Sequence, residues 1–255
     1  MKAVWKGYLG FGLVNIPVAL YTAVDDSGIS FRLLHKKDNG PINYKRVCSE
    51  CGEEVEWDNI VKGLEVGKDE FYVLTQEEIE ELKPESDDLI EIHEFVPSEE
   101  IDPLYINKKY FIGLQEGGER AYTLFKGVIE SQGKVAIGSF VMREKKYLCM
   151  VKNYKKGLVL TLLNYADDIR SIENVPNIDY EPPALKDKEI ELSNKLIENM
   201  STERFELSKY KNTFQENLRE AIKKKAKGER VSIHKKKVKK TENLIESLEA
   251  SLKQK

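Results

Sequence analysis

The sequence predicts an α+β protein, mainly β, in which an antiparallel barrel or sandwich precedes a helical C-terminal region. Short runs of branched and aromatic residues, separated by turn residues, fill the first two thirds of the 255 residues. Few helices lie between these runs, which favours antiparallel pairing over parallel crossovers. After a proline-rich stretch the apolar residues recur at helical spacing instead.

Five runs have the composition of β-strands. They are GLVNIPVALYTAV (12–24), ISFRLLH (29–35), KVAIGSFVM (134–142), YLCMV (147–151) and LVLTLL (158–163). Proline cannot donate a hydrogen bond to a neighbouring strand. Pro17 therefore predicts that the first of these strands lies at an edge or carries a bulge.

Two helices interrupt the strands. TQEEIEELKP (75–84) begins with Thr75 as a cap, has Glu78 at the capping-box position and ends at Pro84. GGERAYTLFKGVIESQG (117–133) is bounded by glycines. Its apolar residues fall on one face, which predicts a helix lying on a sheet. They are Ala121, Leu124, Phe125, Val128 and Ile129.

Residues 36–69 are extended in character but carry few apolar residues and much charge. Such a segment cannot supply both faces of a packed strand, so we expect it to project from the β-domain as a long hairpin or arm. Exposed strand edges pair readily with another chain. In a homodimer this pairing would be reciprocal about a two-fold axis.

The prolines of residues 172–185 indicate a linker. The domain organisation we expect is a β core of residues 1–184 that includes the arm, followed by a helical region of residues 185–222. Residues 223–255 are expected to form a lysine-rich tail that ends in a short helix.

The formal net charge of −3 hides a strong segregation of charge along the chain. Residues 77–102 carry twelve acids and one lysine, whereas residues 223–240 carry ten basic residues and one acid. The local field can therefore attract a polyanion although the whole chain is slightly acidic.

Cysteine content and hydropathy bear on the compartment. Three cysteines argue against a disulfide framework and for a reducing environment. The first residues lack the apolar core of a signal peptide, and no run approaches the roughly 18 apolar residues of a membrane span. We therefore expect a cytoplasmic protein with no membrane partner.

Catalytic motifs are missing from the sequence. It has three histidines, and it contains no nucleophile elbow, phosphate-binding loop or His-Glu-x-x-His pattern. His93 lies in an acidic strand, where a structural role is expected. We therefore predict no enzyme activity and no cofactor.

Cys48 and Cys51 have the spacing of half a zinc ribbon. Tetrahedral zinc requires four ligands, which His35 and Cys149, or a second copy of the pair across a dimer axis, could complete. A redox role requires a helix that begins after the first cysteine, and this segment is not helical in character. The favoured interpretation is a tight turn without metal, with zinc binding and redox chemistry as the alternatives.

Basic residues are the more informative signal. Positive charge on the projecting arm suits a strand that lies against phosphates, although solvated hairpins carry such residues too. No aromatic residue lies among the lysines of residues 223–240, which disfavours a stacking platform for single strands there. The candidate DNA-binding residues are Lys36, Lys37, Lys45, Arg46, Lys62, Arg143, Lys145, Lys146, Lys223, Lys224, Lys225, Lys235, Lys236 and Lys237.

Several blocks of the sequence, in one order and spacing, resemble the prokaryotic Ku family. The resemblance extends over roughly residues 1–200, and so many blocks in one order make it specific. The blocks are WKGYLGFGLVNIPVALYTA, RLLHKKDNGPINYKRVCSECGEEV, DNIVKGLEVGKDEFYVLTQEEIEELKP, EIHEFVPSEEIDPLYINKKYFIG, GGERAYTLFKGVIESQGKVAIGSFVMREKKYL and LNYADDIRS.

The resemblance implies an antiparallel β-barrel with a long bridging arm, which forms a ring as a homodimer. Such a ring threads onto double-stranded DNA ends without sequence preference and recruits DNA ligase D, with its polymerase module, for non-homologous end joining. The protein would then be cytoplasmic and nucleoid-associated, and the pair of cysteines would lie at a hairpin tip of the arm. The acidic residues 77–102 would lie on the outer wall of the ring.

Two other classes of function remain open from the residues themselves. One is a zinc- or thiol-dependent protein, either an enzyme or a nucleic-acid binder, that uses Cys48 and Cys51. The other is a general nucleoid protein that binds through its lysine-rich tail, since basic tails bind nucleic acid without specificity.

Overall fold

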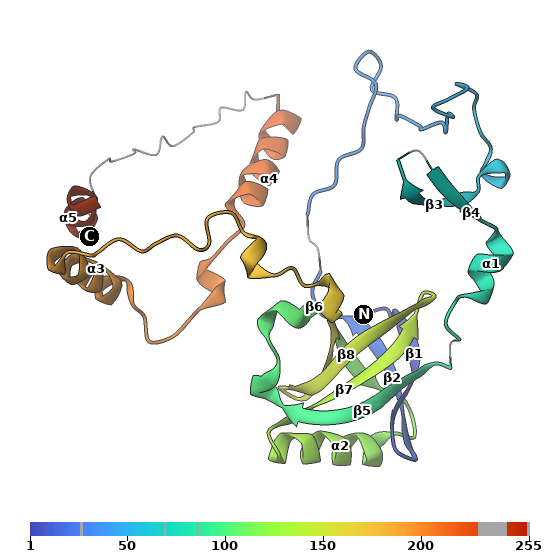
Figure 1. The fold of residues 1–255 in the computed structure, drawn as a ribbon, viewed down its shortest axis with the longest axis horizontal. Helices are drawn as coiled ribbons and strands as arrows, with labels where there is room; N and C mark the ends of the chain where they lie inside the picture. Colours follow the sequence, from blue (N-terminus) through green and yellow to red (C-terminus); the bar gives the residue numbers. More distant parts are fainter. Residues whose placement is uncertain (26–27, 69, 86, 229–243, 254–255) are drawn as a thin grey trace. The chain divides into compact units, whose positions relative to one another are not determined.

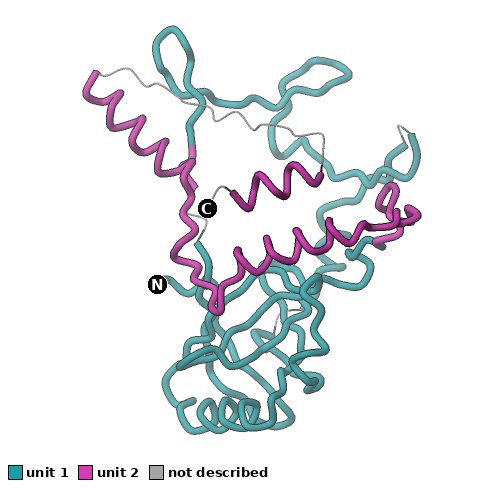
Figure 2. The backbone as a smooth tube through the Cα atoms, turned by 90° about the vertical axis from the view of Figure 1, so that its left-hand side faces the viewer, with its two compact units in different colours: residues 1–27, 31–171 teal, residues 28–30, 172–255 magenta. Residues whose placement is uncertain are grey.

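The computed structural model describes residues 1–25, 28–68, 70–85, 87–228 and 244–253. The chain forms two compact units, drawn in different colours in Figure 2. The first comprises residues 1–27 and 31–171, and the second comprises residues 28–30 and 172–255. The units divide at the start of the expected linker.

The first unit is built on a closed β-barrel, as Figure 1 shows. Its strands, in order around the barrel, are β1 (Trp5–Phe11), β2 (Val14–Thr22), β6 (Ile106–Leu114), β9 (Gly157–Leu163), β8 (Lys145–Tyr154), β7 (Lys134–Met142) and β5 (Leu89–Pro97). The expectation of a mainly β fold with a barrel is confirmed. All neighbouring pairs are antiparallel except β1 and β5, which are parallel and close the barrel.

Two glycines permit this closure, because the backbone of β5 lies close to both of its neighbours. A Cβ atom at Gly7 of β1 would lie 2.0 Å from the carbonyl oxygen of Asp88. A Cβ atom at Gly138 of β7 would lie 2.2 Å from the carbonyl oxygen of Glu91. Any larger residue would push β5 away, so glycine is required at both positions.

The barrel interior is filled by aliphatic side chains from every strand. The largest that are completely buried are Leu9, Ile16, Leu20, Ile90, Leu158 and Leu160. Each buried leucine or isoleucine contributes about 1.5–3 kcal/mol relative to exposure, so this interior dominates the stability of the unit. Cys149 is part of this core, and burial raises the pKa of its thiol to about 12.

Helix α2 (Glu119–Ser131) lies against the barrel, and its buried residues are Phe125 and Ile129. The face expected from the sequence is partly wrong, because Leu124 and Val128 are exposed. The hydrogen bonds of Tyr122 explain why α2 is rotated about its axis relative to the predicted orientation. Its hydroxyl donates to the carbonyl of Ile112 (3.1 Å) and accepts from the amide of Leu158 (3.0 Å), which joins the helix to β6 and β9.

Two local expectations about strands are wrong. β2 has neighbours on both sides and pairs with β1 without a register shift, so Pro17 lies neither on an edge strand nor at a bulge. It lies one residue before the pairing with β6 begins at Val18. Its missing N–H therefore removes no bond of that ladder. Residues 29–35 form no strand, because apart from a single bridge at Leu34 this stretch has no strand partner.

The arm is much longer than the sequence suggested. No described residue between positions 21 and 89 is buried. This stretch contains a turn of 3₁₀ helix (Trp57–Asn59), the hairpin of β3 (Lys62–Gly67) and β4 (Glu70–Leu74), and helix α1 (Gln76–Glu81). The capping box predicted for α1 is confirmed, since Thr75 and Glu78 each bond the backbone amide of the other.

His93 of β5 is hydrogen-bonded to the hydroxyl of Ser139 on β7, with the ring Nε2 2.9 Å from Oγ. The register of the two strands shifts between Ile92 and Glu94, which places His93 at a bulge. The structural role expected for this histidine fits this arrangement.

The second unit consists of α3 (Asp187–Met200), α4 (Thr213–Ala226) and α5 (Leu244–Lys253), with connecting segments. Helix α3 packs against α5, and Lys188 forms an ion pair with Glu249 (2.9 Å). Helix α4 begins after Asn212, whose side chain accepts a hydrogen bond from the amide of Gln215 and caps the helix. No described residue of this unit is buried. Among the described helices, none combines the length and apolarity needed to cross a membrane.

Candidate nucleic-acid interface

The candidate DNA-binding residues lie in three places, and all that the structure describes are exposed. The first place is the arm, with Lys36, Lys37, Lys45, Arg46 and Lys62. The second is the β7–β8 hairpin, with Arg143, Lys145 and Lys146. The third is the end of α4, with Lys223, Lys224 and Lys225. Lys235, Lys236 and Lys237 lie outside the described residues.

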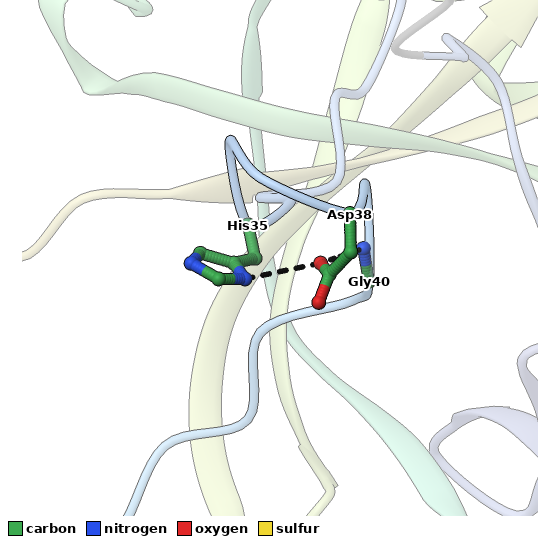
Figure 3. A network of polar contacts seen from close by, with 3 residues as sticks. All are labelled: His35, Asp38 and Gly40. Atoms are coloured by element: carbon green, nitrogen blue, oxygen red, sulfur yellow. Dashed lines mark hydrogen bonds and ion pairs between the residues drawn. The ribbon is translucent and has the colours of Figure 1, made fainter.

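The tip that carries Lys36 and Lys37 is a tight turn. The amide of His35 donates to the carbonyl of Gly40 (2.8 Å), and the amide of Asn39 donates to the carbonyl of His35 (2.8 Å). The Asp38 carboxylate lies 3.0 Å from His35 Nδ1 and accepts from the Gly40 amide (2.9 Å). Figure 3 shows these three residues at the turn. The Gly40 amide, and then His35, lower the pKa of Asp38.

A second turn, thirteen residues further along, has the same backbone pattern. The amide of Cys48 donates to the carbonyl of Glu53 (2.9 Å), and the amide of Gly52 donates to the carbonyl of Cys48 (3.0 Å). Gly52 has φ +73°, in the left-handed region that Asn39 (φ 58°) adopts in the first turn. The backbone amide of Cys51 lowers the pKa of the Cys48 thiol.

His35 and Asp38 therefore stand in the first turn where Cys48 and Cys51 stand in the second. Sequence reasoning missed this repeat because the paired positions carry different side chains. Cys149 is enclosed in the barrel core and is not a partner for either turn. Within the described part of the chain, no three metal-ligating side chains come together.

The stem of the second turn holds aromatic as well as basic residues. The guanidinium of Arg46 lies 4.5 Å from the ring centroid of Trp57, a cation–π arrangement. Lys45 Nζ lies 2.6 Å from a carboxylate oxygen of Glu54. These side chains, with Tyr44, line a hollow of about 550 Å³.

Residues 36–69, the segment predicted to form the arm, are not positive as a whole. Residues 36–69 contain six lysines and arginines but eight acids, which corrects the expectation of a basic arm. Positive charge is local, in the first turn and beside Trp57. The ion pair with Glu54 partly neutralises Lys45, so Lys36 and Lys37 are better placed to meet phosphate.

The β7–β8 hairpin turns through Arg143 (φ 52°) and Glu144 (φ 63°), both in the left-handed region. Such φ values are favoured in two-residue hairpin loops because they match the twist of the strands. Glu144 also forms an ion pair with Lys83 (2.9 Å), which lies two residues after the end of α1. The hydrogen bonds that Lys83 donates, first to Glu80 and then to Glu144, raise the pKa of Lys83. The arm is thereby connected to the barrel at its C-terminal root.

Lys146 has acidic surroundings. It lines a hollow of about 200 Å³ together with Glu85, Asp87 and Glu91. These carboxylates belong to the acidic stretch that was expected on an outer wall. They make Lys146 less suited to phosphate than Arg143 or Lys145, whose side chains are exposed at the turn.

Lys223, Lys224 and Lys225 occupy the last turn of α4. Cations there stabilise a helix through its dipole whether or not DNA is present, so their position has a structural explanation too.

Comparison with known proteins identifies the family. Residues 10–192 match the family model Ku70/Ku80 beta-barrel domain. The chain is 36% identical to a protein of Bacillus subtilis (strain 168) over 98% of this chain and 80% of the relative. It is 37% identical to one of Archaeoglobus fulgidus over 99% and 98%, and 38% identical to one of Lachnoclostridium phytofermentans over 97% and 95%. All three are named "Non-homologous end joining protein Ku". The chain belongs to the Ku family.

Proposed function

We propose that this protein is a non-enzymatic homodimer that binds the ends of double-stranded DNA without sequence preference and acts in non-homologous end joining. Two copies form a ring that threads onto an end. The ring then recruits DNA ligase D and its polymerase module. The protein works in the cytoplasm, associated with the nucleoid.

The observation that carries this proposal is the architecture of the arm. It leaves the barrel after β2, rejoins it at β5, and has no buried residue among those described between positions 21 and 89. Because its described residues are not buried, this segment has no hydrophobic core of its own. It is attached to the barrel at both ends, so it can pass around a duplex when a second copy closes the other side.

Contacts to the phosphate backbone explain binding without base preference. The arm supplies Lys36 and Lys37, and the β7–β8 turn supplies Arg143 and Lys145, all of them exposed. Each phosphate contact releases condensed counterions, so the logarithm of affinity falls linearly with the logarithm of salt concentration.

The proposed domain organisation keeps residues 1–184 as the ring-forming core. Residues 185–222 and the tail of residues 223–255 are assigned to ligase contact and to flanking DNA. The exposed apolar side chains of α4, such as Phe214 and Ile222, suit a partner surface.

The decisive experiment compares linear and covalently closed circular duplex of one sequence in a gel-shift competition at 0.1 M salt. Threading predicts that linear duplex competes and the circle does not. Equal competition would instead assign the protein to the general nucleoid class. Turnover that is lost in a folded Cys48→Ser, Cys51→Ser variant would assign it to the thiol- or zinc-dependent class.

A further inference from the structure

We propose that the hollow beside Trp57 on the arm binds an unpaired nucleobase, so that DNA ends with a single-stranded overhang are bound more tightly than blunt ends. This inference rests on the proposed function, because the overhang reaches the hollow only when the protein holds a DNA end.

The first support for the proposal is the exposure of two aromatic rings at the hollow, those of Trp57 and Tyr44. Trp57 leaves 68% of its surface exposed although the Arg46 guanidinium lies 4.5 Å from its ring centroid. Tyr44, which precedes Lys45, is 81% exposed. Base stacking on aromatic rings and on arginine planes is the usual means by which proteins bind unpaired nucleotides.

The charged side chains that line the hollow favour a base over a phosphate as its ligand. Its lining contains two cations, Lys45 and Arg46, and two carboxylates, Glu54 and Glu56. Lys45 is already paired with Glu54 at 2.6 Å, and Arg46 lies over the indole. A phosphate would be repelled by the two carboxylates, because both cations of the lining already have partners. A neutral base gains stacking and finds hydrogen-bond acceptors in the same carboxylates.

The backbone holds this arrangement in place. The amide of Val55 donates to the carbonyl of Arg46 (2.9 Å), and the amide of Ile60 donates to the carbonyl of Trp57 (3.1 Å). The stem of the turn and the 3₁₀ segment therefore position the guanidinium and the indole before any ligand arrives. Preorganised rings lose little side-chain entropy on stacking.

Trp57 also provides the measurement. The chain has two tryptophans, and Trp5 is 9% exposed inside the barrel. Quenching of tryptophan fluorescence therefore reports on Trp57. The probe is a hairpin duplex with one free end, either blunt or with a four-nucleotide 3′ overhang. Wild type should show stronger quenching and tighter binding with the overhang.

The variant Trp57→Leu should reduce the affinity for the overhang roughly tenfold and leave the affinity for the blunt duplex within about twofold. Trp57→Phe, which keeps a ring, should retain most of the preference. The matched control is Phe71→Leu, an equally apolar change at an exposed aromatic residue of β4, which should change neither affinity.

Equal loss of affinity for both ends in Trp57→Leu, or no loss for either, overturns the inference. A free single-stranded oligonucleotide should quench the fluorescence of the wild type saturably, and Trp57→Leu should lose binding of that oligonucleotide in a gel shift. This pair of results supports the site even if the blunt duplex does not bind. Failure of the proposed function is thus distinguishable from failure of this site.

Discussion

The barrel and the arm follow opposite physical rules within one chain. The barrel buries aliphatic side chains from every strand, and its geometry is determined by packing. The arm buries none of its described residues, and its shape depends on hydrogen-bonded turns, ion pairs and one cation–π pair. A region without a core is free to present its side chains to a partner, and the energy that fixes it can come from binding.

The substitution with the largest expected effect destabilises the barrel. Gly138→Ala places a Cβ atom 2.2 Å from the Glu91 carbonyl oxygen. Either β5 must move away from β7, or the two strands cannot pair at this position. We expect a loss of at least about 3 kcal/mol in unfolding free energy, measured by denaturant titration. The control is Gly127→Ala in α2, where the added methyl group meets nothing within 4 Å. It should stabilise the protein by about 0.5–1 kcal/mol. Equal stability of the two variants would contradict the close approach of β5.

The next effect tests the arm without touching the barrel. Lys36→Glu with Lys37→Glu should weaken binding of linear duplex by about tenfold at 0.1 M salt and reduce the salt slope by about 2, because two phosphate contacts are lost. Unfolding free energy should not change, since both side chains are exposed.

The matched control for that variant is Lys155→Glu with Lys156→Glu, an equal charge reversal in the exposed β8–β9 turn. An equal loss of affinity in the control would mean that total charge, and not the arm, determines binding. Lys45→Gln should have a smaller effect than the Lys36 and Lys37 change, because Lys45 is already paired with Glu54.

Removal of all residues after Leu207 deletes α4 and α5 and leaves the barrel and α3 in the chain. The barrel should keep its melting temperature within about 2 °C, because no described residue of the second unit is buried. Stimulation of the ligase should be lost. A variant of full length with Lys223, Lys224 and Lys225 changed to alanine should retain it if α4 acts through its apolar side chains. A large fall in melting temperature on truncation would refute the independence of the barrel.

The smallest effect is a local pH dependence in the arm. The pKa of Asp38 is lowered from its ordinary value of 3.8, so the ionised carboxylate stabilises the first turn at higher pH. That contribution is complete above 3.8 and is lost as the pH falls through the lower pKa of the folded protein. The Gly40 amide shift in NMR spectra should therefore titrate with a midpoint below 3.8. Asp38→Asn should abolish the titration, and a midpoint above that value would contradict the hydrogen bond.

Local sequence signals predicted well wherever the cause is local. Composition identified the strand at residues 134–142, the bounds observed for β7. Thr75 and Glu78 predicted the cap of α1 because both bonds form within four residues. The exposed arm was recognised from its charge, although its length was underestimated because residues 29–35 have strand composition without a strand partner.

The candidate site could be predicted only in part. Basic residues were identified by type, but their partners are set by the fold. Sequence order cannot show that Glu54 forms an ion pair with Lys45 or that Lys146 lines a hollow together with three carboxylates. The stacking of Arg46 on Trp57 joins residues eleven positions apart, across a turn whose closure depends on Gly52. The signal that could have found it is the turn itself, which brings residues 46 and 57 side by side.

The sequence alone determined the β class, the capped helix, the exposed arm and the resemblance to a family, because composition, period and motif order are properties of the chain. Tertiary structure decided the parallel closure of β1 and β5, the face that α2 buries, and which basic side chains are free. These depend on which backbones approach each other, and that is settled by packing around Gly7, Gly138 and Tyr122.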